Sequence, residues 1–352
     1  MSSPRLPAIS GLLVIALLAG GCAERSSTIA PASTGGVKGK LETSLHGTGR
    51  GMEYFYEAEQ GGFEALTHIP YEDLACQSCH LQPADCGECH VQVGDTPVDA
   101  KCTDVCHSRQ RAEIEQGLPD AHRGRLLCAD CHDGNDVHGD GRHRESMLEA
   151  GAITASCENA DCHPSGTLPV NDYHARHAGN IECAACHAQS VVTCVNCHFD
   201  NEVEGKPKVH AGMHTGWKFL VRDTQSNKIS LANVITMVYQ DSLAQVTFAP
   251  YHAHTITKDA ITDCSDCHST PYKDEYYTTG ELTVVKWDKA TRKLVPNIQG
   301  KGIIPVVQGW ETDYKFDFGT IQTEGDPPTW KRVEPTSVGH NMLFAEPLER
   351  MP

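Results

Sequence analysis

Eight short motifs along the chain each place two cysteines just before a histidine. Six of them have the spacing CxxCH, and the other two insert one and two further residues between the cysteines. Random placement at these cysteine and histidine frequencies gives roughly 0.05 CxxCH motifs per chain. In chain order they are motif 1 (Cys76, Cys79, His80), motif 2 (Cys86, Cys89, His90), motif 3 (Cys102, Cys106, His107), motif 4 (Cys128, Cys131, His132), motif 5 (Cys157, Cys162, His163), motif 6 (Cys183, Cys186, His187), motif 7 (Cys194, Cys197, His198) and motif 8 (Cys264, Cys267, His268).

These residue types are the ones that attach haem c to a protein. Two thiols add across the vinyl groups of haem, and the adjacent histidine becomes the proximal ligand of the iron. Of the 17 cysteines, all but Cys22 belong to the motifs, which predicts eight covalent haem c groups. Disulfides would not explain a histidine after every second cysteine, and zinc ribbons would need an arbitrary fourth ligand for each motif.

The histidines outside the motifs predict a sixth ligand for every iron. Eight distal ligands are needed, and the 20 histidines supply more than enough. Iron with two histidine ligands has no open position for a substrate, which favours electron transfer over catalysis. His46 and His340 rank low because they lie near the two ends of the chain. The candidate distal ligands are His68, His122, His138, His174, His177, His210, His214 and either His252 or His254, with His143 as an intermediate candidate.

Over residues 68–268 the chain resembles the multihaem c-type cytochromes of respiring bacteria, specifically octahaem members of the exported lipoprotein type. The resemblance rests on the motifs and on the stretch GWKFLVRD…VTFAPYHAHTI…DCSDCH. It implies an iron-containing electron-transport protein of anaerobic respiration. Seven motifs fall between Cys76 and His198, so their haems must lie next to one another, whereas motif 8 follows after a gap.

Three functions agree with this pattern. The first, and favoured, is an electron conduit that passes electrons along a haem chain to redox partner proteins or to extracellular or metal acceptors. The second is a multihaem reductase of a nitrogen or sulfur oxyanion at one open haem. The place to look for it is beside motif 8, at Tyr272, Lys273, Tyr276 and Tyr277, although a surface loop is the better interpretation of these residues. The third is a subunit of a haem filament, in which spare histidines ligate a neighbour's haem.

The charge of the chain excludes one class of partner. The formal net charge of −17 argues against nucleic acid, which binds clustered lysine and arginine, and favours cationic partners or metal acceptors. Asp133 and Asp136, with Asp140 and Gly141, resemble a Ca²⁺-binding loop without the full EF-hand pattern. A solvated turn is the better interpretation of this segment.

The N-terminal residues predict export. Arg5 and an apolar stretch over residues 9–19 form a signal peptide that ends in a lipobox-like Gly-Gly-Cys, so residues 1–22 predict a lipid anchor on Cys22. This places the protein in the periplasm or at the cell surface, most simply on the outer membrane. Residues 23–67 lack sustained periodicity and predict a flexible tether.

The fold class expected from the rest of the chain is mostly coil, with short helices wrapped around haems. Residues 68–198 form the haem-dense region, 199–263 a small β element, and 264–352 the eighth haem and a β-containing tail. With only 6% aromatic residues, the haems would supply much of the interior. Helices are expected at 109–117 and 143–152, and strands at 217–222, 234–239, 246–248 and 303–307, with a hairpin at 282–287 and 292–295.

Overall fold

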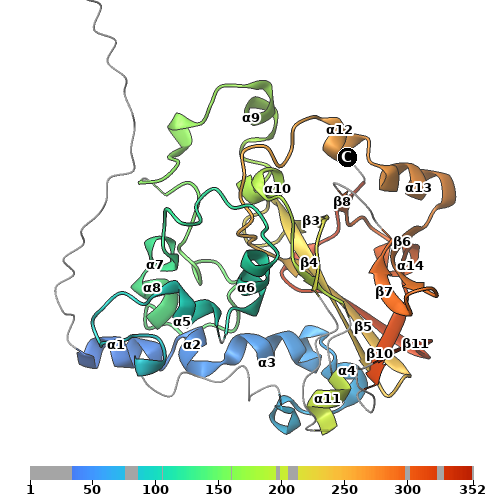
Figure 1. The fold of residues 1–352 in the computed structure, drawn as a ribbon, viewed down its shortest axis with the longest axis horizontal. Helices are drawn as coiled ribbons and strands as arrows, with labels where there is room; N and C mark the ends of the chain where they lie inside the picture. Colours follow the sequence, from blue (N-terminus) through green and yellow to red (C-terminus); the bar gives the residue numbers. More distant parts are fainter. Residues whose placement is uncertain are drawn as a thin grey trace, which may run out of the picture.

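A mixed sheet of six strands forms the centre of the computed structural model (Figure 1), which describes residues 34–75, 86–104, 106–159, 161–195, 199–204, 213–297, 302–322 and 329–350. Three strands follow one another as an antiparallel meander, and strands from the C-terminal part join at both sides. The meander is β3 (Trp217–Asp223), β4 (Ile229–Tyr239) and β5 (Leu243–Pro250); β12 (Ser337–Met342) runs parallel to β5, β8 (Gly302–Pro305) parallel to β3, and β13 (Ala345–Glu346) antiparallel to β3.

Smaller sheets flank this centre. The hairpin of β6 (Leu282–Asp288) and β7 (Lys293–Pro296) is extended by β9 (Tyr314–Phe316), which runs parallel to β6. A second hairpin joins β10 (Phe318–Gln322) to β11 (Thr329–Val333). The short β1 (Thr193–Cys194) and β2 (Met213–His214) pair beside motif 7.

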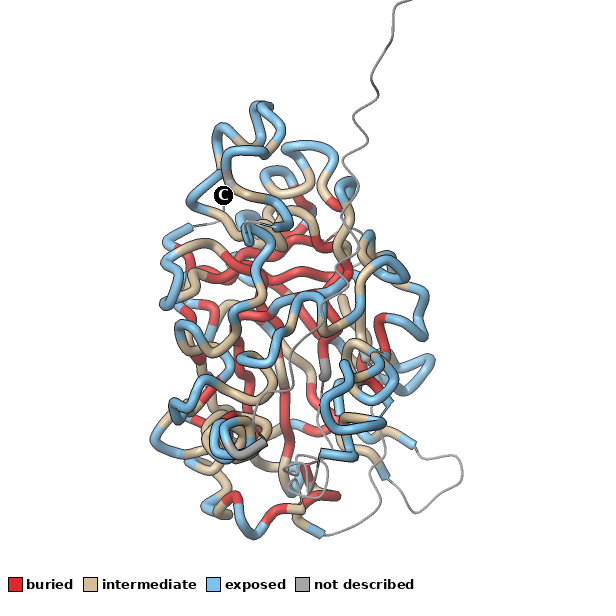
Figure 2. Tube along the Cα trace, turned by 90° about the vertical axis from the view of Figure 1, so that its left-hand side faces the viewer, coloured by how far each residue is buried: buried red, intermediate tan, exposed pale blue. Residues whose placement is uncertain are grey.

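The hydrophobic core lies along the central sheet, where buried residues follow the strands (Figure 2). Aromatic rings from distant segments meet there: the Phe219 and Phe248 ring centres are 5.1 Å apart, and those of Phe248 and Trp310 are 4.9 Å apart. Strand β4 is buried over most of its length, as expected for a run of Val, Ile, Leu and Ala covered on both faces. The strands therefore provide a rigid support for the motif-bearing segments.

Short helices make up most of the regular structure outside the sheets. In Figure 1 the row from α1 to α3 and the group from α5 to α8 lie on the side away from β6 and β7. The α-helices are α1 (Thr34–Leu41), α2 (Leu45–Thr48), α3 (Arg50–Tyr56), α4 (Glu64–Thr67), α5 (Asp99–Thr103), α6 (Ser108–Glu115), α7 (Cys128–Cys131), α8 (Gly134–His138), α9 (Asp172–His177), α10 (Cys183–His187), α11 (Phe199–Glu204), α12 (Ser265–His268), α13 (Pro271–Thr279) and α14 (Trp310–Asp313). Single 3₁₀ turns occur at η1 (Ala58–Gln60), η2 (Tyr71–Asp73), η4 (Cys86–Glu88) and η5 (Ser165–Thr167).

The predicted fold class, a mostly coil chain wrapped around haems, is wrong. Of the described residues, 32% are helical and about 25% lie in strands, and the largest sheet has six strands. The individual strands of the meander, the hairpin and β8 were predicted correctly. The error lies in how the strands pair. Strand β12, from the C-terminal part of the chain, pairs with β5, so the region expected to be a small β element is part of the central sheet.

Two local expectations also differ from the structure. Residues 34–67, expected in a flexible tether, form α1 to α4, and they are held because Tyr56 and Phe63 are buried against Phe199 of α11. Residues 143–152 form turns, in which Glu149 Oε1 accepts from the backbone N–H of Glu145, in place of the expected helix. Residues 1–33, with the predicted signal peptide and Cys22, lie outside the described residues. Within the described ranges, no helix combines the length and apolar character that crossing a membrane needs.

Candidate functional site

Each motif histidine that the structure describes faces a second histidine from outside the motifs. The paired rings come from segments that are far apart in the chain as well as from neighbouring ones. The pairs, with the distance between ring centres, are His90 with His138 (5.9 Å), His107 with His46 (6.1 Å), His132 with His254 (6.2 Å), His163 with His122 (6.4 Å), His187 with His174 (6.2 Å) and His268 with His177 (6.4 Å).

This separation is the one that an ion held between two axial imidazoles requires. With a metal–nitrogen bond of about 2.0 Å and about 1.1 Å from that nitrogen to the ring centre, two coaxial imidazoles have centres about 6.2 Å apart. In the described part of the chain, no group of three or more histidine, cysteine, aspartate or glutamate side chains could hold a metal by itself. The pairs therefore suit a metal whose other four ligands come from a planar macrocycle, which is the case for haem iron.

Hydrogen bonds to backbone carbonyls fix Nδ1 of several of these rings. His174 Nδ1 lies 2.9 Å from Pro169 O, and His187 Nδ1 lies 3.2 Å from Thr257 O. His90 and His177 make the same kind of contact, with Asp95 O at 2.6 Å and Tyr173 O at 2.9 Å. Because a carbonyl oxygen only accepts, Nδ1 carries the hydrogen in each ring and the lone pair is on Nε2. This is the tautomer and orientation of a metal-binding histidine.

The two stretched motifs close their loops with the same backbone bond as the regular ones. In the regular motifs 2 and 4, the histidine N–H donates to the carbonyl of the first cysteine, at 2.8 Å in motif 2 and 2.9 Å in motif 4. In the stretched motifs 3 and 5, His107 N donates to Cys102 O at 3.0 Å and His163 N donates to Cys157 O at 3.1 Å. The extra residues widen the turn, yet the histidine still returns to the first cysteine.

Local packing explains how several partners reach their motifs. In α9, Asn171 Oδ1 caps the helix by accepting from His174 N at 2.9 Å, and His174 and His177 follow one turn apart, so one short helix serves motifs 6 and 8. Gly139 ends α8 with a φ of +81°, and a Cβ there would lie 2.9 Å from the Cβ of Ser44. This close approach seats α2, which carries His46, against α8, which carries His138.

Burial favours the neutral form of four of the paired imidazoles, and the neutral form is the one that binds a metal. It lowers the pKa of His254 to about 4, with nearby His132 adding to the effect. Burial is also the main cause of the lowered pKa of His46, His107 and His138, and further imidazoles reinforce it. At neutral pH these rings are ready to act as ligands without losing a proton.

Thiols of different motifs lie close together. Burial raises the pKa of Cys267 to about 11, and Cys186 of motif 6 contributes to the rise. Burial likewise raises the pKa of Cys131, with a contribution from Cys162 of motif 5. The neighbouring thiols are Cys89 with Cys102, Cys102 with Cys128, Cys131 with Cys162, Cys157 with Cys183, and Cys186 with Cys267. They connect motifs 2, 3, 4, 5, 6 and 8 in one series, and the described thiols in it are free cysteines.

The structure changes the ranking of the distal candidates. His46, ranked low from the sequence, faces His107, and His254 rather than His252 faces His132. The sequence did not indicate His46 as a ligand because its segment, within residues 23–67, predicts a flexible tether. His122, His138, His174 and His177, which the sequence also predicted as distal candidates, each face a motif histidine.

The remaining candidates for distal ligands have other surroundings. His68 ends α4 with a φ of +54°, and the ring of His143 lies 3.2 Å from Glu145. Strand pairing puts His214 opposite Thr193, beside motif 7, and His340 packs its ring on Trp310 at 5.4 Å. Cys76, Cys79, His80, Cys197, His198 and His210 lie outside the described residues, as does the side chain of Cys194.

The tyrosine-rich segment beside motif 8 has structural contacts. Tyr272 is buried in the core, Tyr276 donates to Asp313 Oδ2 at 2.8 Å, and Lys273 Nζ donates to His268 O at 3.0 Å. His268 itself faces His177, with ring centres 6.4 Å apart.

The acidic segment that resembles a Ca²⁺ loop is also engaged. Asp133 Oδ1 caps α8 by accepting from two backbone N–H groups. Asp136 accepts from His132 and from Thr154.

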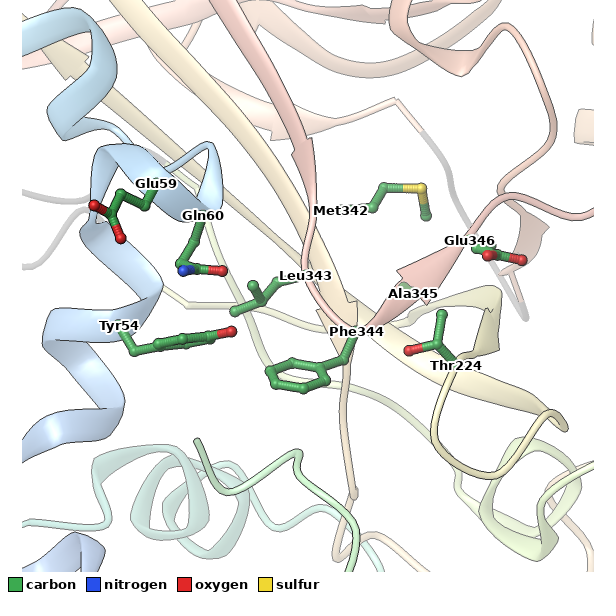
Figure 3. Close-up of a pocket in the computed structure, with 9 residues that line it drawn as sticks. All are labelled: Tyr54, Glu59, Gln60, Thr224, Met342, Leu343, Phe344, Ala345 and Glu346. Atoms are coloured by element: carbon green, nitrogen blue, oxygen red, sulfur yellow. The ribbon is translucent and has the colours of Figure 1, made fainter. Parts of the chain in front are cut away.

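A shallow depression of about 370 Å³ lies between α3 and the turn after β12 (Figure 3). The rings of Tyr54 and Phe344 sit 6.0 Å apart in it, and Glu59 and Glu346 lie at opposite ends. No cysteine or histidine lines it, so it is separate from the histidine pairs.

No family model, no curated protein and no solved structure matches this chain. Support for a function therefore comes from the geometry of the chain's own residues.

Proposed function

We propose that the chain is an electron-transfer protein that carries eight covalent haem c groups, one on each motif. Bound haem c supplies reversible one-electron chemistry at its iron. The observation that carries the proposal is the set of histidine pairs with ring centres 5.9 to 6.4 Å apart.

The protein's residues have three tasks in this function. The motif cysteines hold the macrocycle by thioether bonds, and the motif histidine and its partner hold the iron from both sides. Carbonyl groups such as Pro169 O and Thr257 O fix the ring orientations. Because both axial positions are filled by imidazole, the chain offers no iron position to a substrate, and it conducts electrons rather than converting a molecule.

The neighbouring thiols support a route through the molecule. They connect motifs 2, 3, 4, 5, 6 and 8 in this order, with motifs 2 and 8 at the ends of the described series. Electrons enter from a one-electron carrier and leave to a redox partner protein or to an extracellular or metal acceptor. The net charge of −17 favours cationic partners through steering.

Export and anchoring belong to the same proposal. The sequence from Arg5 to Cys22 predicts a signal peptide with a lipid anchor. The protein would then lie in the periplasm or at the cell surface, held on the outer membrane by the lipid of Cys22.

Electron paramagnetic resonance of the oxidised protein tests the coordination. We expect only low-spin ferric signals, because each iron has two imidazole ligands. A stoichiometric high-spin signal that changes on addition of nitrite would overturn the conduit in favour of a reductase. Such an open iron would be sought first at motifs 1 and 7, because their histidines, His80 and His198, lie outside the described residues.

A further inference from the structure

One motif histidine contacts a buried carboxylate. His132 Nδ1 lies 3.1 Å from Asp136 Oδ2, and the Asp136 side chain is 3% exposed. Asp136 Oδ1 accepts from both the backbone N–H and the hydroxyl of Thr154, each at 2.6 Å, and Oδ2 also accepts from Ala155 N at 3.2 Å. These bonds fix the carboxylate against the ring. A carboxylate at this position makes a ligand imidazole more electron-rich.

The other oriented rings lack such a contact. His187 and His174, the two rings of motif 6, point Nδ1 at neutral carbonyl oxygens. His90 does the same. His122 Nδ1 lies 3.5 Å from Asp120 Oδ1, beyond an ordinary hydrogen bond, and that oxygen already accepts from the His122 backbone N–H. Among the described rings with a hydrogen bond at Nδ1, His132 is the one whose partner is a buried carboxylate.

A buried lysine lies further along the thiol series. Lys218, on β3, is 4% exposed, and its Nζ donates to Ala188 O at 2.8 Å, next to His187. Its positive charge lowers the pKa of Cys186 in motif 6, although burial outweighs it there. The hydrogen bond to Ala188 O thus places the Lys218 charge beside the histidine of motif 6.

We infer that Asp136 and Lys218 give the haem series a direction, which rests on the proposed function. Asp136 favours the ferric form at motif 4, and Lys218 favours the ferrous form at motif 6, because a negative charge stabilises the more positive iron and a positive charge opposes it. Electrons within the chain are then driven from motif 4 toward motif 6. Asp136 and Lys218 are positioning residues that act through the ligands and the field around the haems.

Removing one distal histidine gives the iron of a single motif a high-spin signal, which serves as a tag for that motif. His254→Ala opens the iron of motif 4, and His174→Ala opens that of motif 6, so each gives a high-spin signal whose reduction can be titrated by electron paramagnetic resonance. Asp136→Asn in the first background should raise the potential of the tagged iron. Lys218→Met in the second should lower it. A tenfold change in the reduction equilibrium is expected in each case, about 59 mV for one electron.

The two variants also control each other. Asp136→Asn should leave the motif 6 tag unchanged, and Lys218→Met should leave the motif 4 tag unchanged. Asp140→Asn, which removes an exposed carboxylate paired with Arg144, and Lys218→Arg, which keeps the charge, should shift neither tag.

The haem content distinguishes failure of the inferred direction from failure of the proposed electron-transfer function. Intact mass under denaturing conditions must show eight haems in every variant. With eight haems, an unshifted tag or a shift of the opposite sign overturns the direction set by these charges and leaves the conduit standing. A chain without haem overturns both.

Discussion

His174 and His187 hold their imidazole rings 6.2 Å apart while Nδ1 of each ring donates to a backbone carbonyl. A helix cap at Asn171 orients the first ring, and the motif helix α10 carries the second. Two rings fixed from behind, with their Nε2 lone pairs available, form a ligand pair before any metal is bound. Such preorganisation is what makes a site selective for a metal with two axial positions.

Removing one partner histidine should open a single iron. In His177→Ala, the ring that faces His268 is lost, so one haem should become high-spin in the oxidised protein while the others stay low-spin. The thioether bonds still hold that porphyrin, and the haem count should not change. His340→Ala is the control, since His340 packs on Trp310 instead of a motif histidine. Identical spectra for both variants would rule out His177 as a ligand.

Gly139 should be needed for the pairing of His46 with His107. In Gly139→Ala, the added Cβ meets the Cβ of Ser44 at 2.9 Å on a backbone with positive φ, so α2 must move and the motif 3 iron should lose its low-spin signal. Gly141→Ala provides a matched control, because its φ of +91° imposes the same kind of strain of about 1–2 kcal/mol but its Cβ would meet no atom within 4 Å. Equal spectra in both variants would mean that the contact with Ser44 does not position His46.

Glu113 should make the protein less stable as the pH rises. Burial raises the pKa of this fully buried carboxyl from 4.5 to about 7, opposed by Arg123. Because the folded pKa is the higher one, stability is fully present below about pH 4.5 and is lost as the pH approaches and passes about 7, by up to about 3 kcal/mol. Glu113→Gln should remove this loss, whereas Glu115→Gln, on the exposed side of α6, should not.

The measurement is the free energy of unfolding from denaturant titrations at pH 5 and pH 8. The difference between the two pH values should shrink in Glu113→Gln relative to wild type. A difference of the same size in wild type and Glu113→Gln would show that Glu113 does not carry the pH dependence.

Cys22 should anchor the protein through lipid. Cys22→Ser removes the thiol that follows the apolar stretch and Gly-Gly, so the protein should move from the membrane fraction to the soluble fraction. Its haem content should remain the same, which distinguishes release from failed maturation. Retention of the variant on membranes would argue against lipidation.

The motifs could be found from sequence because their chemistry is local. Two cysteines and a histidine within a few residues define each attachment site, and the strands from 217 to 250 were predicted from their β-branched and aromatic residues. The partners of the motifs are different, since pairing His254 with His132 depends on chain segments brought together by the sheet. No local spacing encodes that contact.

The same limit explains the wrong fold class. The segment 337–342 has no strong strand pattern of its own, and it becomes β12 because β5 offers it a parallel edge. Likewise, α1 to α4 are short and weakly periodic, and they are ordered by Tyr56 and Phe63 packing on Phe199. Tertiary contacts supplied the structure that local propensity did not indicate.

Intact-mass spectrometry of the denatured mature protein tests the central claim most directly, because only covalent haem survives denaturation. The account predicts eight haem additions on one chain, with all 16 motif cysteines consumed, that is the 17 cysteines less Cys22. Six additions would contradict the use of the stretched motifs 3 and 5. A mass without haem, from cells that mature c-type cytochromes, would contradict the account as a whole.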